Sequence, residues 1–204
     1  MNRYDFLLDS FETERIKTLS VWSQFSDSDM SFRPEPRART PHEHMVHQCV
    51  SEDTWMRTML GIDLGVPPLP EQENRLNFLT TYANASEKRL LSLRSKPESW
   101  FEETTKFFGV ERSCAWVLVR RVAHTAHHRG QLTAYLRVLG RELYSTYGPT
   151  ADTGGLFQNQ APVIYRYSDV STLLESEERG GISRALPGPG DKSPTERPDS
   201  AKSG

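Results

Sequence analysis

The chain has 204 residues, with 25 basic and 27 acidic side chains and a formal net charge of −2. This length allows one domain with a full apolar core. The isoelectric point of about 6.3 and the lack of a basic stripe argue against a nucleic-acid partner. No run approaches about 18 consecutive apolar residues, so we expect no membrane span.

The two cysteines, Cys49 and Cys114, lie in separate predicted helices. They form neither a CxxC pair nor a disulfide framework, and each is interpreted as a small core residue. The first ten residues include Asp5 and lack the apolar stretch of a signal peptide. A reducing cytoplasm is therefore the expected location.

The N-terminal half predicts three helices separated by proline-containing loops. Loosely periodic apolar residues favour a helix over residues 3–23, and residues 26–36 have the composition of a loop. Thr40-Pro-His-Glu43 is a capping box with proline in the first turn, so a second helix begins there and runs to about Leu60, before Gly61. A third helix is expected over residues 71–95.

The C-terminal half predicts one long helix followed by irregular chain. Residues 97–112 are consistent with either a turn or a short hairpin. A helical pattern then runs from Ser113 to Leu139, where Gly140 is a typical stop. Residues 144–167 are expected to be irregular and 168–178 to form a short helix. The fold class predicted is all-α: a four-helix bundle domain over 1–178, with a C-terminal extension, and a disordered Gly/Pro/Ser-rich tail over 179–204.

The pair His124 and His128 is the most informative feature of the sequence. Four residues apart in a predicted helix, they lie on one face, one turn apart, and can bind one metal ion. Val117, Leu132 and Leu139 fall within about 60° of His128 on the same helix, so the pair points inward. The alternative is two core histidines satisfied by protein partners.

Zinc-like ions take three or four ligands, so further donors are needed. The second helix offers His42, His44 and His47, whose spacing does not match the HExxH pattern of metalloproteases. Of these, His47 is favoured, because His42 lies in the exposed first turn. His47 lies nearly opposite the apolar stripe of its helix, which suits a polar cavity and equally suits a solvent-exposed face.

A histidine midway along the second helix, followed by His124-x-x-x-His128-Arg-Gly-Gln-Leu132, resembles the DinB/YfiT-like metalloenzyme family. The similarity spans roughly residues 1–147. It implies a four-helix bundle in which His47, His124 and His128 hold a divalent metal, often nickel or zinc, and in which homodimers are common. His127 points about 100° away and is not expected to be a ligand.

A three-histidine site leaves coordination positions open for a water, a thiol or a substrate oxygen. The resemblance implies a metal-dependent enzyme, a transferase or hydrolase, with transfer that depends on a low-molecular-weight thiol as the expected activity. The alternatives are a non-catalytic metal-binding stress-response protein and a scaffold. The sequence does not identify the substrate.

Three further residues are candidates for contact with substrate or for support of a ligand. Arg121, two turns before His128, can bind a carboxylate or phosphate, or pair with an acidic residue inside the bundle. Tyr135 can donate a hydrogen bond into the cavity or simply pack. Gln131 can support a metal ligand. Gly130 is interpreted as a close contact point between helices.

Overall fold

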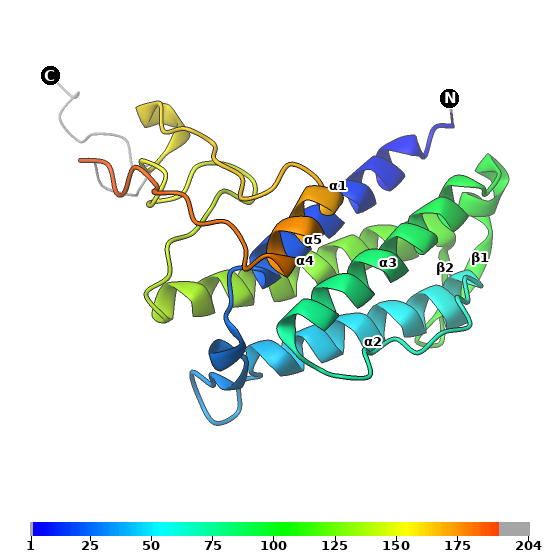
Figure 1. Cartoon of the computed structure of the whole chain (residues 1–204). Helices are drawn as coiled ribbons and strands as arrows, with labels where there is room; N and C mark the ends of the chain where they lie inside the picture. The colour runs from blue at the N-terminus through cyan, green and yellow to red at the C-terminus, as the bar shows by residue number, and fades with distance from the viewer. Residues whose placement is uncertain (1, 192–204) are drawn as a thin grey trace, which may run out of the picture.

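The computed structural model describes residues 2–191 and is mostly helical. Four long helices form the bundle, and a short fifth helix follows the C-terminal extension (Figure 1). The helices are α1 (Asp5–Trp22), α2 (Pro41–Leu60), α3 (Arg75–Arg94), α4 (Cys114–Val138) and α5 (Val170–Glu178).

The helices pack so that α4 lies against both α1 and α2, while α3 lies against α1 and contacts α2. The helix α5 lies over α1 and α3 (Figure 1). This arrangement confirms the predicted all-α bundle. It also places α2 and α4, which carry the predicted ligands, side by side.

Helix ends follow the capping signals of the sequence. Thr40 accepts a hydrogen bond from the Glu43 amide, while the Glu43 carboxylate accepts one from the Thr40 amide, so the predicted capping box is confirmed. Gly61 and Gly140 follow α2 and α4 with φ of +64° and +70°, a left-handed conformation that glycine adopts without steric cost. These caps fix where the two ligand-bearing helices begin and end.

The start of the third helix was predicted too early. The expected start was residue 71, whereas α3 begins at Arg75, and Asn74 is its N-cap, accepting from the Asn77 amide. An asparagine side chain satisfies a free amide in the first turn, which favours a start directly after it. Residues 71–74 therefore belong to the loop that passes α2.

A short antiparallel hairpin connects the bundle between α3 and α4. Its strands are β1 (Thr104–Phe107) and β2 (Val110–Ser113), and the sequence had left this segment open between a turn and a hairpin. Phe108 and Gly109 form the two-residue loop, both with positive φ (+46° and +86°). Positive φ at both loop residues is the pattern of a type I′ turn. The hairpin packs on the C-terminal part of α2 and the start of α4.

The apolar core consists of two clusters at the two ends of the bundle. One joins α1, α2, α3, α4 and α5 around Trp22 and Phe78, and the other surrounds Leu90 and Phe101. Cys49 and Cys114 are both buried in these clusters, as predicted for small core residues. Burial raises the pKa of both thiols, so they remain protonated at neutral pH.

Charged side chains are also buried inside the bundle. Glu52 of α2 accepts hydrogen bonds from Tyr82 and Arg89 of α3, and all three side chains are buried. Arg89 also donates to Asp53. Such groups are tolerated because each is paired and hydrogen-bonded. These contacts hold α3 against α2 at Glu52 and Asp53, which follow His47 along α2.

The extension after α4 runs over the bundle with little regular structure apart from a short 3-10 turn (Phe157–Asn159). Of the predicted tail, residues 179–191 lie within the described part of the chain, and residues 192–204 lie outside it. Ile182 packs against the core cluster and Tyr144 hydrogen-bonds the backbone of Arg184. The division between domain and tail at residue 178 stays a prediction.

Candidate metal centre

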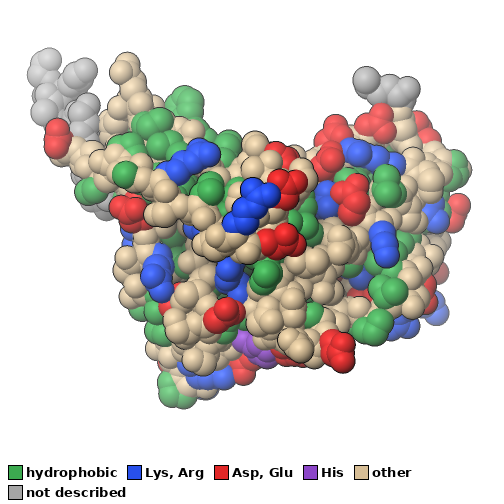
Figure 2. Space-filling model, viewed as in Figure 1, with side chains coloured by type: hydrophobic (Ala, Val, Ile, Leu, Met, Phe, Trp, Pro, Cys, Tyr) green, Lys and Arg blue, Asp and Glu red, His purple; other side chains and the backbone are tan. Residues whose placement is uncertain are grey.

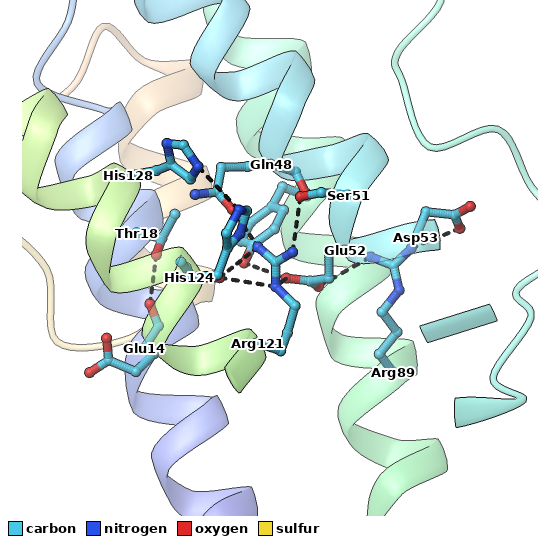
Figure 3. A network of polar contacts seen from close by, with 12 residues as sticks. Glu14, Thr18, Gln48, Ser51, Glu52, Asp53, Arg89, Arg121, His124 and His128 are labelled. Carbon is cyan, nitrogen blue, oxygen red and sulfur yellow. Dashed lines mark hydrogen bonds and ion pairs between the residues drawn. The ribbon is translucent and has the colours of Figure 1, made fainter. Parts of the chain in front are cut away.

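The histidines His47, His124 and His128 converge between α2 and α4. One ligand atom from each lies within 4.8 Å of the others. The i, i+4 spacing on α4 directs His124 and His128 toward α2, as the close-up shows (Figure 3). His47 reaches them from the middle of α2. The three rings that the family resemblance implied as ligands therefore lie together, and their binding of a metal stays a prediction.

The spacing of the ring nitrogens suits a metal ion. The Nε2 atom of His124 lies 3.4 Å from that of His47 and 3.2 Å from that of His128. Nitrogens bound tetrahedrally at about 2.0–2.1 Å from one zinc-like ion would be about 3.3 Å apart. A single proton on the His124 Nε2 can satisfy one of its two contacts, whereas one cation satisfies all three nitrogens. The donor set fits a divalent metal.

The protonation states of the rings also suit a metal. Burial, with the charge of Arg121, lowers the pKa of His124 to about 3. Burial, with the neighbouring histidines, lowers the pKa of His128 to about 4. Burial and the charges of Arg39 and Arg121 lower the pKa of His47. The three imidazoles are therefore neutral at pH 7, the form that binds metal ions.

The orientation of His128 is set by Gln131. The His128 Nδ1 lies 2.9 Å from the Gln131 Oε1, one turn further along α4. An Nδ1–H donating to this oxygen leaves the Nε2 lone pair directed at the other two rings. Gln131 itself is exposed at the edge of the centre.

Arg121 lies beneath the centre and connects the two helices. Its guanidinium is buried and donates to Gln48 and Ser51 of α2 and to Thr125 of its own helix (Figure 3). The Glu52 carboxylate lies 4.0 Å away. The contact with Glu52 is the pairing with an acidic residue inside the bundle that the sequence offered as one of two roles. The fixed positive charge also opposes protonation of His124.

His44 is a fourth histidine of the centre that the sequence did not select. It is 1% exposed, its ring faces His128 and Tyr135 edge to face, and neither ring nitrogen has a hydrogen-bond partner among residues 2–191. Burial lowers its pKa to about 4. A signal was present in the sequence: His44, Gln48, Glu52 and Trp55 recur on one side of α2, and all are buried.

Trp55 is a second neighbour that the sequence missed. Its ring lies 5.2 Å from the ring of His124 and packs edge to face on Phe107 of the hairpin. The tryptophan therefore covers the centre on the side of β1. An apolar wall of this kind limits the access of water to His124 from that side.

The remaining candidates occupy the rim. Tyr135 is half-buried, between Phe32 and His44. His42 pairs with Glu73 on the outside of α2, and His127 is exposed, so neither belongs to the cluster. Figure 2 shows histidine side chains at the surface over the region of α2. The expectation that Gly130 marks a close helix contact is wrong, because an added Cβ there would meet no atom within 4 Å.

The fold and the centre together define a helical bundle that brings three histidines from two helices to one point. A family model described as the DinB family matches residues 1–158. The chain therefore belongs to the DinB family. No curated protein matches the chain significantly.

Solved structures agree with this assignment at the level of the fold. A DinB-like protein from Bacillus cereus is 19% identical, with a TM-score of 0.64, over 72% of this chain and 100% of that one. The DinB-like protein YjoA from Bacillus subtilis is 15% identical, with a TM-score of 0.54, over 67% of this chain and 94% of that one. In residues 2–191, no helix is both long enough and apolar enough to cross a membrane.

Proposed function

We propose that this DinB family member is a divalent-metal enzyme whose ion is held by His47, His124 and His128. The observation that carries the proposal is the convergence of three neutral ring nitrogens at the spacing of one coordination sphere. Nickel and zinc are the proposed ions, since imidazole binds both well.

The proposed reaction is attack of a low-molecular-weight thiol on an electrophilic carbon of the substrate: a carbon–sulfur bond forms, the bond from that carbon to its leaving group breaks, and the leaving group departs with the proton that the thiol gives up. A divalent ion with three neutral ligands has open positions and supplies Lewis acidity that lowers the pKa of a bound thiol or water. Among residues 2–191, no carboxylate or cysteine joins the histidine cluster. The open positions are therefore available to a molecule from outside the chain.

The side chains around the cluster would hold the metal ligands in place and limit the access of water to them. Gln131 holds the tautomer of His128 through the 2.9 Å contact. Arg121 fixes α2 against α4 through Gln48 and Ser51. Trp55 and the hairpin limit access of water on one side. Tyr135 and Arg121 are the residues we propose for contact with substrate or support of the ligands.

The test is metal analysis of tag-free protein followed by thiol binding. We expect about one nickel or zinc ion per chain, lost in His47→Ala, His124→Ala and His128→Ala but retained in the control His127→Ala. In cobalt-loaded protein, a thiol should produce a sulfur-to-cobalt charge-transfer band. Metal binding without any response to thiols would favour the alternative, a non-catalytic metal-binding protein.

We further propose a cytoplasmic homodimer without a nucleic-acid partner. The support is the acidic net charge and the implication of family membership. Light scattering coupled to gel filtration should give twice the mass of 23.3 kDa. A monomer mass at micromolar concentration would contradict the dimer.

A further inference from the structure

A pocket on the outer side of α2 borders the predicted metal centre at His47. We name it the Arg39 pocket: it has a volume of about 440 Å³ and includes His47 at one wall. Arg39 precedes the helix, and Val46 and Val50 line the pocket beside His47. Residues at spacings of three and four share one side of a helix, so the pocket follows α2 lengthwise. Glu73, from the loop before α3, closes the other side.

The charged groups of the pocket are paired, with one exception. The Glu43 carboxylate accepts from Arg33 and from the Thr40 amide. The Glu73 carboxylate lies 2.6 Å from the ring nitrogen of His42. Arg39 is exposed and has no hydrogen bond or ion pair within the described residues 2–191. Its five donors are free to bind an anion that enters the pocket.

The positive charge of Arg39 also acts on two histidines, His44 and His47. Burial has the largest effect on the pKa of these two histidines, and the charge of Arg39 has the second largest; both lower the pKa. A metal held by three neutral imidazoles would keep its whole positive charge. The pocket therefore borders two positive points, Arg39 and the centre at His47, and Val46 and Val50 give it an apolar lining.

We propose that the Arg39 pocket selects a substrate carrying a carboxylate, which pairs with Arg39 while an aliphatic segment lies on Val46 and Val50. The opposite end of the same molecule would bind at the open face of the histidine centre. Arg39 is then a specificity-determining residue. This inference rests on the proposed function, because it requires a metal at His47, His124 and His128.

The probes are 6-mercaptohexanoate and 6-mercaptohexanol, which differ in the carboxylate alone. Their dissociation constants would be measured on cobalt-loaded full-length protein from the charge-transfer band. The wild type should bind the carboxylate probe about tenfold more tightly. Arg39→Gln should remove this preference, and Arg39→Lys should retain part of it.

The matched control is Arg37→Gln. Arg37 lies two residues away on the same loop, pairs with Glu35 and does not line the pocket. This variant removes the same charge and should keep the wild-type preference. Equal affinities of the two probes in the wild type, or equal losses in Arg37→Gln and Arg39→Gln, would overturn the inference.

The two levels of the proposal fail in different ways. If cobalt does not bind at all, the proposed function is contradicted and the Arg39 inference with it. If cobalt and both thiols bind with no preference for the carboxylate, the metal centre stands and the role of Arg39 is refuted. Because Arg39 is exposed and makes no hydrogen bond or ion pair within residues 2–191, its variants should fold, which far-ultraviolet circular dichroism verifies.

Discussion

The Arg121 guanidinium of α4 donates a hydrogen bond to the Gln48 amide oxygen of α2. Gln48 directly follows His47, and Arg121 lies one turn before His124. The contact thus joins the two helices at the level where their histidines meet. It links the spacing of the predicted metal ligands to the packing of the bundle.

Replacing Arg121 by methionine should weaken metal binding without removing a ligand. The donors to Gln48 and Ser51 are lost, so the two helices are held less firmly at the centre. Residues that hydrogen-bond metal ligands contribute about 10–100-fold in affinity, and because Arg121 acts indirectly through Gln48 and Ser51 we expect a loss of about tenfold. Competition with a chelator measures it. Arg120→Met, at an exposed neighbouring position, is the control, and equal affinities in both variants would refute the role.

Truncating Glu52 to alanine should strongly destabilise the bundle. Glu52 accepts from Arg89 and Tyr82 in the interior, and its removal leaves the buried Tyr82 hydroxyl without an acceptor and Arg89 with Asp53 as its one remaining acidic partner. Breaking such a pair costs about 3–5 kcal/mol in the free energy of unfolding, measured by urea denaturation. Glu12→Ala, which breaks the exposed pair with Arg94, should cost less than about 1 kcal/mol. Similar losses in the two variants would contradict this account.

The long helices were predictable because their signals are local. The capping box at Thr40 and Glu43, the glycine stop at Gly140 and the i, i+4 pair on α4 act within a few residues of sequence. The motif from His124 to Leu132 carries the resemblance to the family, and this resemblance indicated His47. The position of His47 on α2 alone was consistent with both a cavity and a solvent-exposed face.

Other features depend on chain segments far apart in sequence and could not be predicted. The burial of His44 follows from Tyr135 and His128 on a distant helix. The Arg39 pocket exists because the loop carrying Glu73 passes α2. The hairpin was ambiguous because Phe108 occupies a left-handed position usually given to asparagine or glycine.

The metal-free protein should lose stability as the pH falls from about 6.5 toward 4. Burial lowers the pKa of His44 to about 4 in the folded chain, against about 6.5 when unfolded. Between these values the unfolded state binds more protons, so the free energy of unfolding rises with pH and declines on acidification. His44 alone contributes about 2 kcal/mol to this decline.

The test is urea denaturation of metal-free protein across this pH range. His44→Phe keeps an aromatic ring against Tyr135 and removes the titrating group, so its stability should vary less with pH. A His44→Phe profile as steep as that of the wild type would show that His44 is not the cause.

Phe108→Asn should stabilise the hairpin. Phe108 has φ of +46°, where an ordinary L-residue is strained by about 1–2 kcal/mol and asparagine by less. The ring is 74% exposed, so its contacts with Trp55 and Phe107 contribute little. We expect a net gain of about 0.5–1 kcal/mol in thermal or urea unfolding. Phe107→Ala, which removes a packed ring, should instead destabilise, and a loss in Phe108→Asn would contradict the turn assignment.

The most direct test of the metal centre is X-ray absorption spectroscopy on nickel- or zinc-loaded wild-type protein. Three imidazole nitrogens at about 2.0–2.1 Å, with one or more ligands from outside the chain, are the expected first coordination sphere of the zinc form. A sphere with fewer than three imidazoles would contradict the assignment of His47, His124 and His128. A shell completed by protein side chains alone would contradict the open site.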